Sequence, residues 1–182
     1  MSFSEKWVNA IYKIVTGGNK SKYILTPTGG LIFVTFILSF IFLSFYLDRI
    51  FSFSDFLPAT TAKITGLVLI IPGIIFSGKS IYIFIKSKGT PVPVNPPSEL
   101  ITDGIYGYSR NPMLAGLIMQ LFGYGIFCNS ITLTFIVSPV FMLLSIAELK
   151  FIEEPELEKR FGEKYISYKK SVPMFFPRIF KK

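Results

Sequence analysis

Residues 29–47 read GGLIFVTFILSFIFLSFYL and carry no charged side chain over 19 positions. The hydrocarbon core of a bilayer is about 30 Å thick, and a helix needs roughly 20 apolar residues to cross it. The whole chain agrees with this, because 51% of its 182 residues are apolar and only 16% are charged, against about 25% charged in soluble domains. The stretch therefore predicts a transmembrane helix, and residues 1–182 a single membrane domain.

Three further apolar segments predict transmembrane helices, over residues 64–86, 112–127 and 131–149. Only residues 128–130 separate the last two, so we expect an antiparallel helical hairpin. The expected fold class is thus an all-α membrane protein with about four transmembrane helices.

The N-terminal stretch predicts a helix that lies on the membrane surface. Within residues 1–25, the segment 3–15 places its apolar side chains on one helical face and its polar ones on the other, the pattern of an interfacial helix.

The basic residues predict the orientation of the chain in the membrane. Lys and Arg gather near the N-terminus, between residues 79 and 110 and from residue 150 onward, and are absent at 128–130. Since cytoplasmic loops are enriched in Lys and Arg, we expect both termini in the cytosol, at the plasma membrane or the endoplasmic reticulum according to the source.

The composition excludes several kinds of chemistry. The chain has no His and a single Cys, Cys128, so His-based catalysis, an internal disulfide and a Cys-cluster zinc site are excluded. We expect no metal. The net charge of +8 is interpreted as attraction to anionic lipid headgroups, and we expect no nucleic-acid partner.

Residues 89–112, GTPVPVNPPSELITDGIYGYSRNP, hold five of the twelve prolines. Each proline removes a backbone donor and clashes with the preceding helical turn, so this segment cannot be a continuous helix. Long irregular loops are often functional. We expect an ordered loop on the cytosolic face.

Residues 148–158 contain five glutamates, just where the last apolar segment ends. An unpaired carboxylate at headgroup depth is costly and usually has a task, and a cationic ligand would offset that cost. We expect this of Glu153 or Glu154, and interpret Glu156 and Glu158 as the solvated acidic start of a helix.

The remaining segment, residues 153–177, predicts an amphipathic C-terminal helix in the cytosol. Tyr165 and Tyr168 are followed by Lys169 and Lys170. Aromatic and basic side chains of this kind are enriched at the membrane interface, so we expect the helix to lie along the bilayer surface.

Several short motifs follow one another in a characteristic order: Gly-x-Tyr-x-x-x-Arg-Asn-Pro, a helical hairpin, Glu-Glu, Leu-x-x-x-Phe-Gly-x-x-Tyr-x-x-Tyr and Val-Pro. Their residues are Gly104, Tyr106, Arg110, Asn111, Pro112, Glu153, Glu154, Leu157, Phe161, Gly162, Tyr165, Tyr168, Val172 and Pro173. This order resembles the integral-membrane S-adenosylmethionine-dependent methyltransferases related to isoprenylcysteine carboxyl methyltransferase, with the phospholipid N-methyltransferases as relatives. The resemblance covers roughly residues 66–177.

The resemblance implies that S-adenosylmethionine lies between the loop 89–112 and the start of the C-terminal helix, with S-adenosylhomocysteine as product. A lipophilic acceptor would enter from the bilayer. The implied cofactor contacts are Ser98, Leu100, Ile101, Tyr106, Asn111, Pro112, Met113, Leu114 and Glu153. A carboxylate and an aromatic face both suit a positively charged sulfonium.

The candidate catalytic residues are Arg110, Asn111 and Glu154. Most relatives carry His where this chain has Asn111, and the carboxyl methyltransferases carry an acceptor-orienting Arg where it has Leu149. Glu154 is the nearest candidate for a general base. Arg110 is either an anion clamp or a structural group that caps backbone carbonyls or pairs with Asp103.

We therefore expect methyl transfer from S-adenosylmethionine to a carboxylate, amine or thiol of a lipophilic acceptor at the cytosolic face. One alternative is an NADPH-dependent membrane reductase of the sterol-reductase type, although a phosphate-bearing cofactor favours clustered Arg over a Glu pair. Another is a non-catalytic lipid-binding membrane scaffold. The sequence leaves the acceptor and the oligomeric state open.

Overall fold

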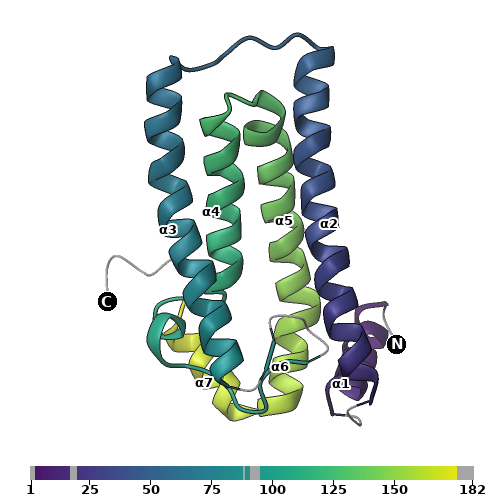
Figure 1. The fold of residues 1–182 in the computed structure, drawn as a ribbon. Helices are drawn as coiled ribbons and strands as arrows, with labels where there is room; N and C mark the ends of the chain where they lie inside the picture. The colour runs from purple at the N-terminus through teal and green to yellow at the C-terminus, as the bar shows by residue number, and fades with distance from the viewer. Residues whose placement is uncertain (1–2, 17–19, 88, 91–94, 176–182) are drawn as a thin grey trace.

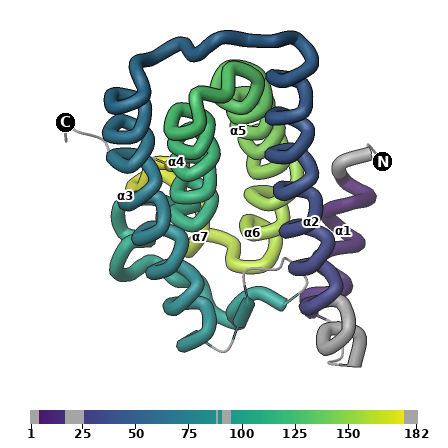
Figure 2. Tube along the Cα trace, turned by 45° about the horizontal axis from the view of Figure 1, so that its top comes forward, coloured from purple at the N-terminus to yellow at the C-terminus, as the bar shows by residue number. Residues whose placement is uncertain are grey.

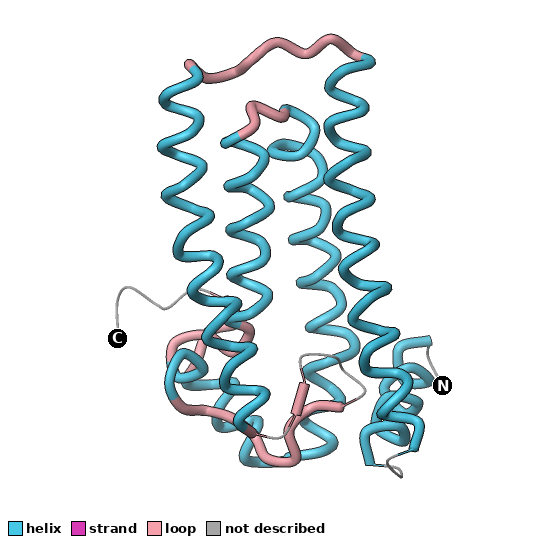
Figure 3. The backbone as a smooth tube through the Cα atoms, in the orientation of Figure 1, coloured by secondary structure: helices cyan, strands magenta, loops and turns pink. Residues whose placement is uncertain are grey.

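The computed structural model describes residues 3–16, 20–87, 89–90 and 95–175 (Figure 1). Throughout these ranges all regular elements are helical (Figure 3), which confirms the all-helical part of the expected fold class. The elements are α1 (Phe3–Thr16), α2 (Lys20–Ile50), α3 (Ala59–Lys86), the 3-10 turn η1 (Gly104–Gly107), α4 (Pro112–Phe127), the π-helical turn η2 (Leu133–Val137), α5 (Ser138–Glu148), the π-helical turn η3 (Leu149–Glu153), α6 (Glu154–Phe161) and α7 (Glu163–Ser171).

Three helical runs are long and apolar enough to cross a membrane: Thr26–Ile50, Ala59–Lys86 and Leu133–Phe161. α4 is also apolar but has only 16 residues. It packs beside α3, and the views agree on this (Figures 1 and 2). The structure thus supports an integral membrane protein with three candidate spans, and the count of four spans stays a prediction.

The helix boundaries differ from those expected at the two ends of the chain. α1 ends at Thr16, and Lys20 already belongs to α2, so part of the expected interfacial segment 1–25 lies in the next helix. Near the other end, η2, α5, η3 and α6 follow one another as one helical run over Leu133–Phe161. The last expected span and the start of the expected cytosolic helix are therefore continuous.

Two prolines explain the π-helical turns in this run. Pro139 and Pro155 each stand just after such a turn. A proline ring clashes with the carbonyl four residues earlier, and in both cases that carbonyl belongs to the π-helical turn, whose wider hydrogen-bond spacing makes room. The Ser138 hydroxyl donates a hydrogen bond of 2.7 Å to the Leu133 carbonyl, which satisfies an acceptor in the first turn.

Glycines bring α3 and α4 into close contact. A Cβ atom added at Gly73 would lie 2.8 Å from the Gly116 carbonyl oxygen, so the two backbones meet without side chains between them. The Gln120 amide of α4 donates to the Ser77 hydroxyl of α3 over 3.0 Å. Small residues and interhelical hydrogen bonds of this kind associate helices in lipid. By contrast, Gly78 faces open space.

Polar contacts fix the end of the helical bundle that lies away from both described chain ends (Figure 2). Asp48, near the end of α2, accepts a hydrogen bond of 2.9 Å from the Thr132 amide and another from the Ser130 hydroxyl. The Asn129 side chain bonds both the amide and the carbonyl of Leu57, at 3.1 and 3.0 Å. A carboxylate at a helix N-terminus is favourable, so Asp48 joins α2 to the start of the Leu133–Phe161 run.

We predict opposite effects for alanine at two glycines of α3. In Gly73→Ala the new methyl group meets the α4 backbone, and we expect about 1–3 kcal/mol of destabilisation from overpacking. In Gly78→Ala it meets nothing, and the higher helix propensity of Ala leaves stability equal or slightly raised. Thermal unfolding of the two variants in one detergent compares them; equal melting temperatures would contradict the α3–α4 packing described above.

Candidate functional site

The irregular loop that follows α3 is held in place by buried aromatic side chains. Tyr106, in η1, is 6% exposed, and its ring centroid lies 5.8 Å from that of Phe84 on α3. The Tyr168 hydroxyl, on α7, donates a hydrogen bond of 2.7 Å to the Tyr106 carbonyl. Burial raises the pKa of both phenols, so both stay protonated and Tyr168 remains a donor. α3, η1 and α7 therefore meet here.

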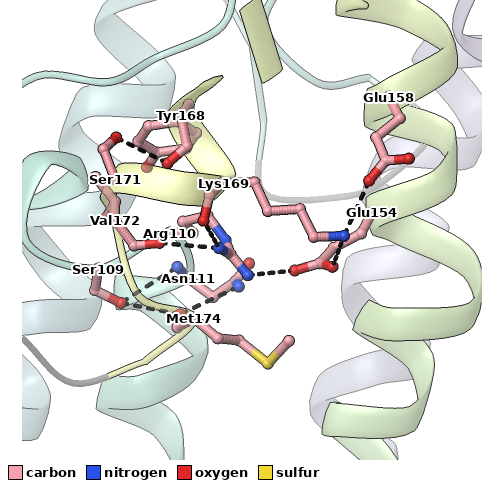
Figure 4. A network of polar contacts seen from close by, with 10 residues as sticks. All are labelled: Ser109, Arg110, Asn111, Glu154, Glu158, Tyr168, Lys169, Ser171, Val172 and Met174. Carbon is pink, nitrogen blue, oxygen red and sulfur yellow. Dashed lines mark hydrogen bonds and ion pairs between the residues drawn. The ribbon is translucent and has the colours of Figure 1, made fainter. Parts of the chain in front are cut away.

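A buried ion-pair network joins the loop to α6 and α7 (Figure 4). The Arg110 Nη2 atom lies 2.5 Å from Glu154 Oε1, and the two side chains are 9% and 5% exposed. Arg110 Nη1 donates to the carbonyls of Lys169 and Val172 over 2.7 and 2.9 Å. Of the structural roles considered for Arg110, it caps carbonyls and pairs with Glu154, whereas Asp103 is exposed.

The second oxygen of Glu154 belongs to the same network. Lys169 Nζ lies 2.6 Å from Glu154 Oε2 and 2.9 Å from Glu158 Oε1. Hydrogen bonds to Glu154 and Glu158 raise the pKa of Lys169, so its ammonium group stays charged. Both oxygens of Glu154 are thus engaged by cations.

Backbone bonds attach the C-terminal end of the described chain to the end of the loop. The Arg110 amide donates to the Pro173 carbonyl at 2.9 Å, and the Asn111 amide to the Met174 carbonyl at 3.1 Å. The Asn111 side-chain amide and the Ser109 hydroxyl donate to the same Met174 carbonyl, at 3.3 and 3.2 Å. The Asn111 side chain is therefore an amide that holds the backbone of the C-terminal segment in place (Figure 4).

A cavity that is partly open to solvent lies between the loop, the end of α3, and helices α6 and α7. Its lining combines aromatic and aliphatic side chains with four charged ones. The lining residues are Phe84, Pro96, Pro97, Glu99, Leu100, Ile101, Tyr106, Arg110, Asn111, Glu153, Leu157, Arg160, Phe161, Tyr165 and Tyr168. We name this the first cavity.

The first cavity brings together six of the predicted site residues, which are Leu100, Ile101, Tyr106, Arg110, Asn111 and Glu153. The other predicted residues lie outside its lining, and these are Ser98, Pro112, Met113, Leu114 and Glu154. Ser98 is exposed, and Pro112 is buried at the start of α4. The Met113 carbonyl accepts a hydrogen bond from the Ser77 hydroxyl. All these assignments to a cofactor site stay predictions.

Two expectations about the C-terminal segment are wrong. Tyr165 and Tyr168 are 2% and 7% exposed, and they form a core with Val172 instead of lying on the bilayer surface. The reason is Gly162, whose φ of 57° ends α6; a Gly tolerates this left-handed conformation, and α7 then continues with its tyrosines under the loop. Glu156, expected to be solvated, is 4% exposed and lies 3.3 Å from Arg160.

A second cavity adjoins the first and reaches α1. It shares Phe84, Pro96, Glu153, Leu157 and Arg160 with the first cavity, and its other lining residues are Ile11, Thr90, Glu148, Ile152 and Glu156. α1 contacts α6 here, because Lys159 Nζ donates to Asn9 Oδ1 over 2.7 Å and lies 4.3 Å from the centre of the Tyr12 ring. No local sequence pattern points to Arg160, because it lines both cavities only once α3, α6 and the loop have come together.

Within the described ranges, no group of three or more His, Cys, Asp or Glu side chains is arranged to hold a metal ion. The fold and the two cavities define a helical membrane protein with a largely apolar cavity, edged by charged side chains, at one end of its helices. A family model described as phospholipid methyltransferase matches residues 61–164, more than half of the chain. Among curated proteins, no match is found.

The chain therefore belongs to the phospholipid methyltransferase family, a family of membrane methyltransferases related to the isoprenylcysteine carboxyl methyltransferases. This confirms the resemblance drawn from the sequence motifs. The matched region begins in α3, contains the loop and the Glu153–Glu154 pair, and ends at the start of α7.

We predict that Glu154→Gln loosens the C-terminal segment. Breaking one side of a buried ion pair leaves a charge unpaired and typically costs about 3–5 kcal/mol. The variant is expected to lower the melting temperature and to speed backbone hydrogen exchange in α7. Glu163→Gln, at an exposed position of α7, is the matched control. If the two variants exchange at the same rate, the network does not hold this segment.

Proposed function

We propose that this protein transfers a methyl group from S-adenosylmethionine to a nucleophilic oxygen, nitrogen or sulfur atom of a lipophilic acceptor at the cytosolic leaflet. Membership of the family establishes a methyltransferase that acts on lipid-type substrates. The observation that carries the finer proposal is the Glu153 carboxylate, which lines the first cavity and makes no hydrogen bond or close ion pair with any residue that the structure describes.

Glu153 fits a positively charged ligand. Its side chain is half-buried and lines both cavities. In the part of the chain that the structure describes, it has neither a hydrogen-bond nor an ion-pair partner. Withdrawing an unpaired carboxylate from water is unfavourable, and a cationic group bound beside it would offset that cost.

The rest of the first cavity fits an aromatic, partly apolar ligand such as an adenosine. Tyr106, Phe161, Tyr165 and Tyr168 supply ring faces and edges, and aromatic faces also attract cations. Burial raises the pKa of Tyr165 as it does that of Tyr106 and Tyr168. These phenols therefore stay neutral, and the negative charge in the cavity comes from carboxylates.

When bound, S-adenosylmethionine supplies an electrophilic methyl group on a positively charged sulfur. The contribution of the chain would be to orient the two reactants and to exclude water from them. Holding two reactants in line supplies an entropic advantage that reaches several kcal/mol, about 7–11 in well-oriented cases. The packed tyrosines of α7 close one side of the first cavity, and Glu153 provides a carboxyl group for the cationic ligand.

Among the candidate catalytic residues, we assign Glu154 a positioning role. Its two oxygens already accept from Arg110 and Lys169, so neither is available to take a proton from an acceptor. Arg110 and Asn111 line the first cavity and are also bound to the backbone of residues 169–174. We propose that they shape the site, with Arg110 held by Glu154.

The family match does not favour either alternative, the NADPH-dependent reductase or the non-catalytic scaffold. α1 and α7 lie at the same end of the helices as the cavities (Figure 1). This arrangement supports a cytosolic site next to α1 and α7, with the acceptor entering from the bilayer.

We predict that Glu153→Gln weakens the binding of S-adenosylhomocysteine by about tenfold or more, because a charge-assisted hydrogen bond is lost without a change of shape. Isothermal titration of detergent-purified protein measures this. Glu163→Gln should bind like the wild type. The proposal fails if folded wild-type protein binds no S-adenosylhomocysteine, and the role of Glu153 fails if its variant binds as well as the control.

A further inference from the structure

Arg160 lies on the boundary between the two cavities and lines both. Its side chain is 13% exposed, and its ion-pair partner is Glu156, whose Oε1 atom is 3.3 Å from Arg160 Nε. Neither of these two buried atoms makes a hydrogen bond. The guanidinium carbon also lies 4.5 Å from the centre of the Phe161 ring. Arg160 thus combines burial with donors that no described residue fills.

The other cations close to the first cavity are engaged by the protein itself. Both terminal nitrogens of Arg110 donate to backbone carbonyls or to Glu154, and only its Nε atom has no partner among the described residues. No terminal nitrogen of Arg160 makes such a bond within the described ranges. Lys169 is bound by two carboxylates. Since a guanidinium carries five donors and no acceptor, Arg160 is the group in the described lining best able to bind an anion.

The charges around Arg160 decide on which side an anion binds. In the second cavity it is accompanied by Glu148, Glu153 and Glu156, which repel an anion. The first cavity contains Glu153 and the exposed Glu99, together with the cation Arg110. An anionic group is therefore favoured on the side of the first cavity.

Glu153 and Arg160 together match a zwitterion. They are seven residues apart on the same helical run, which places them on one helical face and about 10 Å apart along the axis. The side chains of Glu153 and Arg160 are long enough to approach each other across that spacing, and both line the first cavity. An α-amino-acid group carries an ammonium and a carboxylate on one carbon, and so needs one partner of each sign.

We propose that Arg160 binds the carboxylate at the amino-acid end of the cofactor, beside Glu153, which binds the ammonium group. The inference rests on the proposed function and adds a residue and an orientation to it. The amino-acid end lies toward α6, and the aromatic lining of the first cavity is left for the adenosine.

Titration with two ligands tests this in the full chain. S-adenosylhomocysteine has the amino-acid end, whereas 5′-methylthioadenosine keeps the adenosine and the thioether but lacks that end. Arg160→Gln is expected to weaken binding of S-adenosylhomocysteine by about tenfold or more and to leave binding of 5′-methylthioadenosine unchanged. Lys164→Gln, which removes a positive charge at an exposed position of α7, should change neither.

The Arg160→Gln variant leaves Glu156 buried without its ion-pair partner. A double variant, Glu156→Gln with Arg160→Gln, is therefore titrated as well. Thermal unfolding shows which of the variants are folded. If folded variants lose both ligands equally, or lose neither, the assignment of Arg160 is overturned. Equal affinity of the wild type for the two ligands also overturns it, while leaving the proposed function intact. A wild type that binds neither ligand overturns the proposed function itself.

Discussion

The ion pair between Arg110 and Glu154 is the interaction on which the rest of the site depends. In the described part of the loop before α4, η1 is the only regular element, so the position of this part is not fixed by its own hydrogen bonds. Burying two charges is unfavourable unless their remaining donors and acceptors are satisfied. Here two backbone carbonyls bind Arg110 Nη1 and Lys169 binds the second oxygen of Glu154, while Arg110 Nε has no hydrogen-bond partner among the described residues. The loop, α6 and the end of α7 are thereby held in one arrangement, and the first cavity lies between them.

The adjacent carboxylates Glu153 and Glu154 do different work because they are neighbours on a helix. Successive helical residues point about 100° apart. Glu154 therefore faces Arg110 and Lys169, while Glu153 lines the cavities. Pro155 and the π-helical turn before it set the direction of both side chains. A change in either element would alter the ion pair and the cavity together.

Local patterns predicted the apolar helices, the irregular proline-rich loop and the family. Hydropathy and proline act on the segment that contains them, so they can be read without knowing the fold. The burial of Tyr165, Tyr168 and Glu156 could not be read in this way. It depends on Gly162 ending α6 and on the loop covering α7. Arg160 was missed for the same reason, since the two cavities it separates exist only after α3, α6 and the loop have come together.

The part of the chain that matches the family does not enclose the cavities by itself. The match ends at residue 164, but the first cavity needs Tyr165 and Tyr168 for its lining, and Arg110 needs the carbonyls of Lys169 and Val172. At the other end, Ile11 of α1 lines the second cavity from outside the matched region. The shared region supplies the loop and the carboxylate pair, and the flanking helices complete the walls.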